Sequence, residues 1–257
     1  APLDASYHGR PVEVWAPYVG EMARTMMAST YGENAFTQSY RVYTTINSKD
    51  QLAANTALRQ GLLAYDQRHG YRGPMAHFPK AEQTPVSRLE KYLRLIPYAN
   101  GLRPAMVLSL SPQMNSANIL LGNGQTLTLP WSGLSWTGAK SIDRLLKVGD
   151  VIWANQLANG SWQLAQIPQI QGALVSLDTN NGAIQALVGG FDFRLSNFNR
   201  AVQAERLPGS GFKPFIYSAA LDKGYTLASV FNDAPLSFAD PSKPDGVWRP
   251  QNDTHQF

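Results

Sequence analysis

The residues of this sequence best suited to covalent chemistry are Ser210 and Lys213, which stand three positions apart in the run Ser-Gly-Phe-Lys. A serine hydroxyl is a weak nucleophile and needs a base to take its proton. A lysine amine acts as that base where desolvation or a nearby cation keeps part of it neutral. Apolar residues from Phe212 to Ile216 surround the lysine, so we expect an apolar setting in which an unpaired ammonium is costly unless it has a function. The pattern predicts acyl transfer, with Ser210 as nucleophile and Lys213 as general base.

The simpler interpretation of the same residues is a helix cap and a solvated surface lysine. Tetrapeptides of the form S-x-x-K arise by chance in many chains, so the spacing alone does not decide between the two. The surroundings favour catalysis, because Pro208-Gly209 ends the preceding chain and apolar residues follow with helical period up to Lys223-Gly224. We therefore expect a helix that begins near Ser210 and carries Lys213 one turn further along, on the same side.

Helices and a strand upstream must position this segment. A proline in the first turn and a stop glycine predict a helix over residues 17–31. The β-branched and aromatic residues 41–46 predict a strand. Ser48 and Gln51 form a capping box, which predicts a second helix that ends near Gly70.

Two β-rich stretches complete the predicted architecture. Residues 101–169 alternate short β runs with turn signals, the strongest at Asn159-Gly160, and predict a small inserted β-barrel or sandwich. Residues 173–190 predict a hairpin of two nearly continuous apolar strands, which we expect to be covered on both faces.

Longer runs around the serine resemble one known family. Residues 206–221, Arg-Leu-Pro-Gly-Ser-Gly-Phe-Lys-Pro-Phe-Ile-Tyr-Ser-Ala-Ala-Leu, resemble the active-site helix of class A penicillin-binding proteins. Landmarks similar to those of the family before and after this helix are residues 198–201 (Phe-Asn-Arg-Ala), 233–235 (Asp-Ala-Pro) and 248–252 (Trp-Arg-Pro-Gln-Asn). Segments similar to the family's linker are residues 16–19, 42–46 and 65–74. The β-rich stretch resembles the OB-like insertion of the members from Gram-negative bacteria.

The resemblance implies an α+β fold, in which a transpeptidase-like domain of helices packed on an antiparallel sheet is interrupted by a small OB-like β-barrel. It implies a linker and the N-terminal part of the transpeptidase domain over residues 1–100, the insertion over 101–169, and the segment with the active-site helix over 170–257. The family's S-x-N and K-[TS]-G motifs do not follow the helix, and Ser116-Ala117-Asn118 is a chance match that precedes it. We therefore expect an incomplete transpeptidase domain, in a fragment that also lacks the family's glycosyltransferase domain and membrane anchor.

The resemblance also implies a serine D,D-transpeptidase of a bifunctional peptidoglycan synthase at the periplasmic face of the bacterial inner membrane. In that family the motif serine attacks the penultimate D-Ala of a stem peptide, and an acceptor amine then takes the acyl group. Carried over by position, Ser210 is the nucleophile, Lys213 is the base, and the backbone N–H of Ser210 is an oxyanion donor. The expected partners are peptidoglycan stem peptides and β-lactam antibiotics. An outer-membrane lipoprotein or other cell-wall machinery is the expected partner of the OB-like insertion.

Composition removes several other classes of function. The 257 residues contain no cysteine, which excludes disulfides, zinc–thiolate and iron–sulfur sites, and cysteine catalysis. The four histidines lack metal-ligand spacing, so no metal site and no cofactor are predicted. The net charge of +4 comes without a dense basic stripe, so we expect no nucleic-acid partner.

A non-catalytic recognition or scaffold module is the alternative function. In that case Ser210 is only a helix cap, and the OB-like segment binds a protein or polymer partner. Trp131, Trp136, Trp153 and Trp162 are then candidate stacking platforms, although sparse Lys and Arg nearby favour a place in the core of the small barrel. Covalent labelling by a β-lactam separates the two functions.

Overall fold

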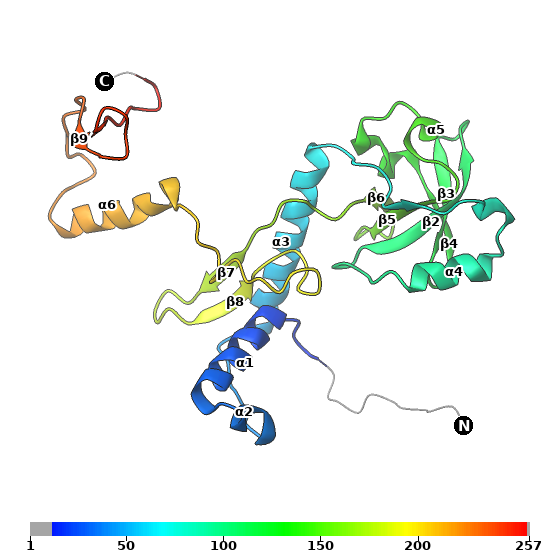
Figure 1. Ribbon diagram of the computed structural model, residues 1–257, viewed down its shortest axis with the longest axis horizontal. Coiled ribbons are helices and arrows are strands. Elements are labelled where there is room, and N and C mark those ends of the chain that lie inside the picture. The colour runs from blue at the N-terminus through cyan, green and yellow to red at the C-terminus, as the bar shows by residue number, and fades with distance from the viewer. Residues whose placement is uncertain (1–11, 256–257) are drawn as a thin grey trace. The chain divides into compact units, whose positions relative to one another are not determined.

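A computed structural model describes residues 12–255 of the chain. The chain divides into two compact units, residues 1–204 and residues 205–257, and each is described by itself. The first unit contains a six-stranded antiparallel sheet and a part built from two helices and a β-hairpin (Figure 1).

The six-stranded sheet has the strand order β1-β5-β2-β3-β4, and β6 pairs with β5. Its strands are β1 (Ala76–His77), β2 (Arg103–Ser111), β3 (Ser116–Leu121), β4 (Thr126–Leu129), β5 (Asp150–Gln156) and β6 (Trp162–Ala165). Among the described residues no hydrogen-bonded pair joins β4 to β6, so the sheet does not close into a barrel, one of the two forms that the sequence predicts. Both of these strands have only four residues, which leaves few backbone groups to close the sheet.

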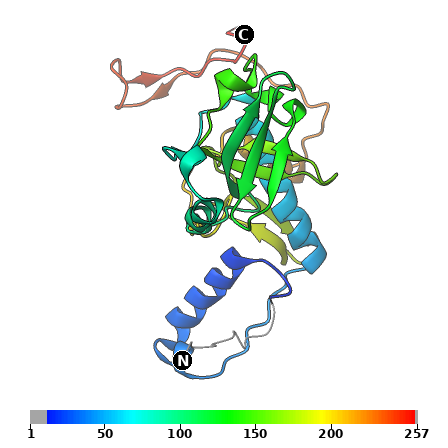
Figure 2. The same ribbon diagram turned by 90° about the vertical axis from the view of Figure 1, so that its right-hand side faces the viewer.

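Alternate residues of β2 contribute to two cores, one on each face of the sheet. Val107 lies in one core, and its neighbour Met106 lies in the other. Met106 packs there with Leu89 and Leu93 of α4 (Val86–Arg94), which lies beside the strands (Figure 2). The other short elements of this unit are α2 (Asn34–Thr37), η1 (Ala81–Gln83), η2 (Trp131–Gly133), η3 (Ser135–Thr137) and α5 (Ile142–Leu145).

The four tryptophans of the β-rich stretch pack against core clusters. Trp131, Trp136 and Trp162 pack against one core of the sheet, and Trp153 packs against a neighbouring cluster. The ring nitrogen of Trp136 donates to the backbone carbonyl of Leu164 at 3.1 Å. All four tryptophans are partly buried and pack beside apolar core residues, which favours the core interpretation over stacking platforms.

Helices α1 (Pro17–Tyr31) and α3 (Ser48–Arg68) confirm the two predicted upstream helices. Asn47 rather than Ser48 caps α3, because its side-chain oxygen accepts from the N–H groups two and three residues later, at 2.9 and 3.3 Å. The predicted capping box is therefore wrong by one residue, and Gln51 has a different role.

Gln51 takes the place of a neighbouring strand at the edge of the predicted hairpin. The hairpin consists of β7 (Leu174–Leu177) and β8 (Ile184–Val188). The Gln51 side chain accepts from the N–H of Leu187 at 2.9 Å and donates to its carbonyl at 3.1 Å. Gln51 is buried, so these two bonds satisfy backbone groups that water does not reach.

The predicted strand over residues 41–46 is wrong. The hydroxyl of Thr45 and the N–H of Asn47 donate to two carbonyls of β8, at 2.7 and 2.8 Å, and no ladder forms. After Asn47 the chain enters α3, and the side chain of Gln51, not a strand backbone, bonds Leu187 further along the same edge.

The hairpin is also less covered than the sequence predicts. Residues of β8 pack with Tyr18 of α1 and Ala54 of α3. On β7, however, Val175 and Leu177 are 44% and 54% exposed within the described residues. The helices lie against β8, and β7 keeps apolar side chains in solvent.

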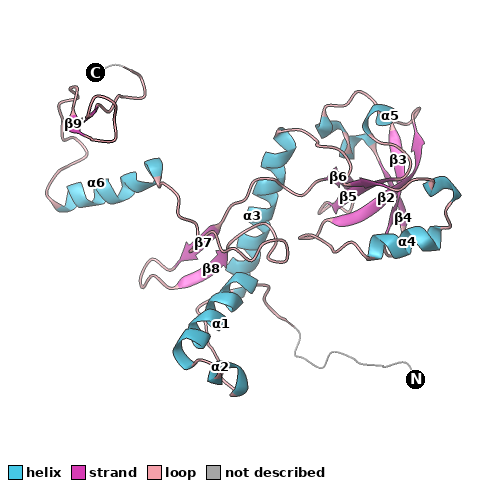
Figure 3. Cartoon of the chain, in the orientation of Figure 1, coloured by secondary structure: helices cyan, strands magenta, loops and turns pink. Residues whose placement is uncertain are grey.

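The second unit begins with η4 (Gly209–Phe212) and α6 (Lys213–Asp222). A two-stranded pair follows, β9 (Phe238–Ala239) with β10 (Val247–Trp248), and most of the remaining chain is loop (Figure 3). Helix α6 ends as predicted, with Lys223 at its C-cap and Gly224 at a positive φ of 88°.

Candidate active site

Ser210 and Lys213 lie at the junction of η4 and α6. Ser210 is inside the 3₁₀ turn, and Lys213 is the first residue of the α-helix, whose N–H bonds to the Ser210 carbonyl. Because a 3₁₀ helix has three residues per turn, positions i and i+3 lie directly above one another. The local backbone therefore places these two residues one turn apart on the same side, as the sequence predicts.

Ser210 does not cap the helix. The N-cap residue of α6 is Phe212, and no side chain makes a capping bond there. Within residues 12–255, neither the Ser210 hydroxyl nor the Lys213 ammonium has a hydrogen-bond or ion-pair partner. The interpretation of Ser210 as a helix cap is therefore not supported. Its hydroxyl makes no hydrogen bond within the described residues that would compete with a role as nucleophile.

The predicted apolar setting of Lys213 is not formed by the second unit. Lys213 is exposed, and no residue of α6 is buried. The rings of Phe212 and Phe215 contact each other at 5.6 Å, yet both remain more than half exposed. The second unit by itself does not supply the expected apolar setting, because none of its described residues forms an apolar layer over the helix.

Two family-like landmarks after the helix contact each other. The side-chain amide of Asn252 donates to the carboxylate of Asp233 at 2.7 Å, although 19 positions separate them in sequence. Between them, Phe238 of β9 pairs with Trp248 of β10, and their rings lie 5.5 Å apart. The structure thus joins the two segments that the sequence only placed in order.

In the first unit, two glycines after β8 allow segments of the chain to approach each other closely. A Cβ on Gly190 would lie 2.5 Å from the Tyr18 hydroxyl and 2.9 Å from a guanidinium nitrogen of Arg200, and one on Gly189 would overlap Asn199. The Tyr18 hydroxyl donates to a backbone carbonyl of this loop at 2.9 Å. Sequence reasoning assigned no role to these residues, although a Gly-Gly pair at the end of a strand is a signal of close approach.

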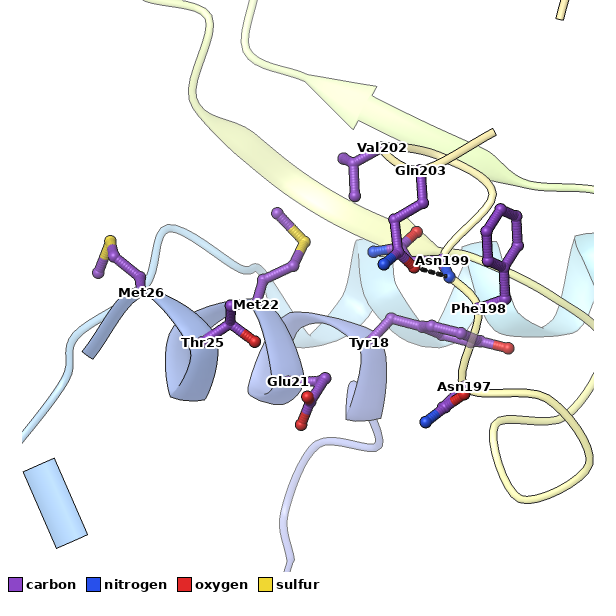
Figure 4. A pocket seen from close by; sticks show the side chains of 10 residues that line it. All are labelled: Tyr18, Glu21, Met22, Thr25, Met26, Asn197, Phe198, Asn199, Val202 and Gln203. Atoms are coloured by element: carbon purple, nitrogen blue, oxygen red, sulfur yellow. Dashed lines mark hydrogen bonds between the residues drawn. The ribbon is translucent and has the colours of Figure 1, made fainter. Parts of the chain in front are cut away.

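A cavity of about 480 Å³ adjoins this loop (Figure 4). Met22 and Met26 of α1 line one side, and Phe198 and Val202 line the other. Burial raises the pKa of Tyr18 at this cavity above its ordinary value, while the positive charge of Arg200 opposes that rise and Asp192 adds to it. The wall is mainly apolar, with amide groups among the aliphatic side chains.

The described residues offer no ready metal centre. From residue 12 to residue 255, no three or more His, Asp or Glu side chains are gathered where they could hold a metal ion.

Comparison with known proteins assigns the chain to a family. A family model described as a penicillin-binding protein OB-like domain matches residues 71–170, and one described as a penicillin binding protein transpeptidase domain matches residues 172–256. Penicillin-binding protein 1A of Haemophilus influenzae is 45% identical over 258 residues, which cover 100% of this chain and 29% of that protein. The chain belongs to the class A penicillin-binding proteins. The Escherichia coli protein of the same name is 41% identical, with 99% of this chain and 31% of that protein covered.

The solved structures agree with this assignment. The 2.6 Å crystal structure of penicillin-binding protein 1A from Haemophilus influenzae superposes with a TM-score of 0.84 at 44% identity. The match covers 100% of this chain and 37% of that one. The chain spans about a third of the length of the curated relatives that it matches.

The predicted family and its transpeptidase-like fold with an OB-like domain are thus confirmed. The OB-like match begins at residue 71, and it includes both β1, which is a strand of the six-stranded sheet, and α4, which packs on that sheet. The predicted domain limits and the roles of Ser210 and Lys213 stay predictions.

Proposed function

We propose that Ser210 and Lys213 form the acylation site of a serine D,D-transpeptidase, part of a bifunctional peptidoglycan synthase. The observation that carries this proposal is the placement of the two residues one turn apart at the start of α6, inside the stretch matched as a transpeptidase domain. The names of the relatives support a role in cell-wall cross-linking.

In the proposed reaction, the Lys213 amine takes the proton of the Ser210 hydroxyl as its oxygen attacks the carbonyl of the penultimate D-Ala. The backbone N–H of Ser210 donates to the oxyanion that forms. Lys213 returns this proton to the amide nitrogen as the C–N bond breaks, and the terminal D-Ala leaves with a neutral amine. An acceptor amine attacks the resulting ester, which restores Ser210 and forms the cross-link. A β-lactam instead acylates Ser210 by opening its ring and leaves slowly.

The reaction requires a neutral Lys213, which an apolar cover favours, and the second unit by itself leaves this side chain exposed. We infer that the reactive state covers Lys213 and the exposed face of α6 with further apolar surface. The exposed rings of Phe212 and Phe215 are the side chains available to contact such a cover.

The proposed function includes a cellular location and a set of binding partners. Between residues 12 and 255, no helix combines the length and the apolar character that a membrane crossing requires. We propose the periplasmic face of the inner membrane as the site of action. Stem peptides and β-lactams are the proposed partners of Ser210, and a lipoprotein or other cell-wall machinery is the proposed partner of the OB-like domain.

A fluorescent penicillin tests the nucleophile in the full-length protein. We expect labelling of the natural protein, no labelling of Ser210→Ala, and full labelling of Ser218→Ala, a control serine in the same exposed helix. Labelling of Ser210→Ala at the rate of the natural protein would contradict the assignment of Ser210 as the nucleophile. If the folded natural protein takes no label, the non-catalytic scaffold becomes the better account.

A further inference from the structure

A second cavity in the first unit has a volume of about 200 Å³ and shares Tyr18 with the cavity already described. It forms where α3, the loop before β2 and the segment after β8 meet. Arg59, Arg194 and Asp192 are its charged lining residues, and Trp15 and Tyr18 supply aromatic walls. The cavity therefore combines guanidinium groups with rings in a small space.

Arg59 carries a positive charge that no described carboxylate compensates. Its Nε donates to the carbonyl of Asn100 at 2.5 Å, and its Nη2 donates to the side-chain oxygen of Asn155 at 2.6 Å. Both acceptors are neutral, and within residues 12–255 no carboxylate lies in ion-pair distance of this guanidinium. An arginine has five N–H donors, so most of its donors have no protein acceptor. Burial lowers the pKa of Arg59, as expected for a charge removed from water without a counter-ion.

Asp192 cannot supply the missing negative charge. One of its oxygens accepts from the N–H and the Nε of Arg194, at 2.8 and 3.3 Å. The other accepts from the Asn100 N–H at 2.5 Å and from Arg194 Nη2 at 3.0 Å. Four donors thus occupy this carboxylate. Two guanidinium groups and one carboxylate leave the cavity with one uncompensated positive charge.

We propose that this cavity binds a carboxylate group, which accepts hydrogen bonds from the open N–H groups of Arg59 and places its apolar part against Trp15 and Tyr18. Guanidinium groups bind carboxylates through two parallel hydrogen bonds, which suits a small and partly enclosed site. The proposal stands on the geometry of the first unit and does not depend on the acylation chemistry of Ser210.

The location gives such a ligand a structural effect. Arg59 belongs to α3 and Asn155 to β5 of the OB-like domain, while Asp192 follows the hairpin. Asn100 contacts both Arg59 and Asp192. A bound carboxylate neutralises the charge at the centre of this junction and thereby stabilises the attachment of the OB-like domain to the hairpin.

Calorimetric titration of the full-length protein tests the site with N-acetylglycine and its neutral amide, N-acetylglycinamide. We expect the carboxylate to bind at least tenfold more tightly than the amide. We also expect Arg59→Gln to weaken carboxylate binding at least tenfold, and Arg24→Gln, which alters an exposed ion-paired arginine, to leave it unchanged. Equal binding of the two compounds, or no binding up to about 10 mM, overturns the proposal.

A measurement on the natural protein tests the site without Arg59→Gln, which could lose binding because it folds poorly. At equal ionic strength, N-acetylglycine should raise the melting midpoint of the first unit and N-acetylglycinamide should not, because a ligand that binds only the folded state stabilises it. The same shift with both compounds contradicts the proposal. Penicillin labelling of Ser210 reports on the proposed function separately.

Discussion

Asp66 of α3 bonds both segments that connect to the OB-like domain, the one that enters it and the one that leaves it. Its carboxylate accepts from Nη1 and Nη2 of Arg72, at 2.9 and 3.0 Å, and from the N–H of Gln169 at 3.2 Å. The OB-like match runs from residue 71 to residue 170, so Arg72 lies at the entry of the domain and Gln169 at its exit. Removing the carboxylate should loosen both crossings.

The burial of this ion pair sets the expected cost. The Asp66 side chain is 4% exposed and that of Arg72 is 33% exposed. Breaking a buried pair by removing one partner costs about 3–5 kcal/mol, whereas exposed pairs contribute roughly 0.2–1 kcal/mol. With one partner buried and the other a third exposed, we expect Asp66→Ala to lower the free energy of unfolding of the first unit by about 2–3 kcal/mol.

Urea unfolding, followed by the fluorescence of the core tryptophans, measures this cost in a double-mutant cycle with Arg72→Ala. We expect a coupling energy of about 1–2 kcal/mol. The Glu90–Arg94 pair on α4, longer at 3.5 Å and more exposed, is the matched control and should couple by less than about 0.5 kcal/mol. A loss below about 1 kcal/mol for Asp66→Ala, or a coupling no larger than that of the control, refutes the reasoning.

Three further changes test other parts of the account. Lys213→Ala should slow acylation by a fluorescent penicillin at least about a hundredfold, while Lys223→Ala should not; equal rates would mean that another base acts. Gln51→Leu leaves two buried backbone groups of β8 without partners, so urea unfolding should show a loss of about 2–4 kcal/mol, and a loss below 1 kcal/mol contradicts the edge role. Burial by itself raises the pKa of Asp192, but hydrogen bonds from Arg194 and Asn100 lower it below its ordinary value. Its contribution to stability is therefore complete above the unfolded pKa of about 3.9 and is lost as pH falls toward the lower folded value, so Asp192→Asn should flatten the acid loss of stability below about pH 4.

Local signals in the sequence predicted the helices that depend on them. The proline in the first turn of α1 and the polar residues before α3 act within a few positions, and both helices form. The strand predicted over residues 41–46 did not form: Thr45 bonds β8 through its side chain, and β propensity alone does not supply a backbone ladder. Helix α4 was not predicted, since its nine residues follow irregular chain rich in glycine and proline.

At the candidate site, too, the sequence predicts local geometry but not tertiary contacts. The spacing of Ser210 and Lys213 is local, and the 3₁₀ turn realises it. The apolar surroundings of the lysine are a tertiary property, and the residues next to it in sequence do not supply them. The junction around Arg59 joins positions 41 and 96 residues away, and no pattern in the sequence links them.

Peptide mass mapping of the acyl-enzyme identifies the nucleophile. The full-length protein is incubated with a penicillin or with a thioester analogue of the stem peptide, quenched, digested and sequenced by mass spectrometry. We predict that the added mass lies on Ser210 with both reagents. An adduct on another residue, or none in a folded protein, would contradict it.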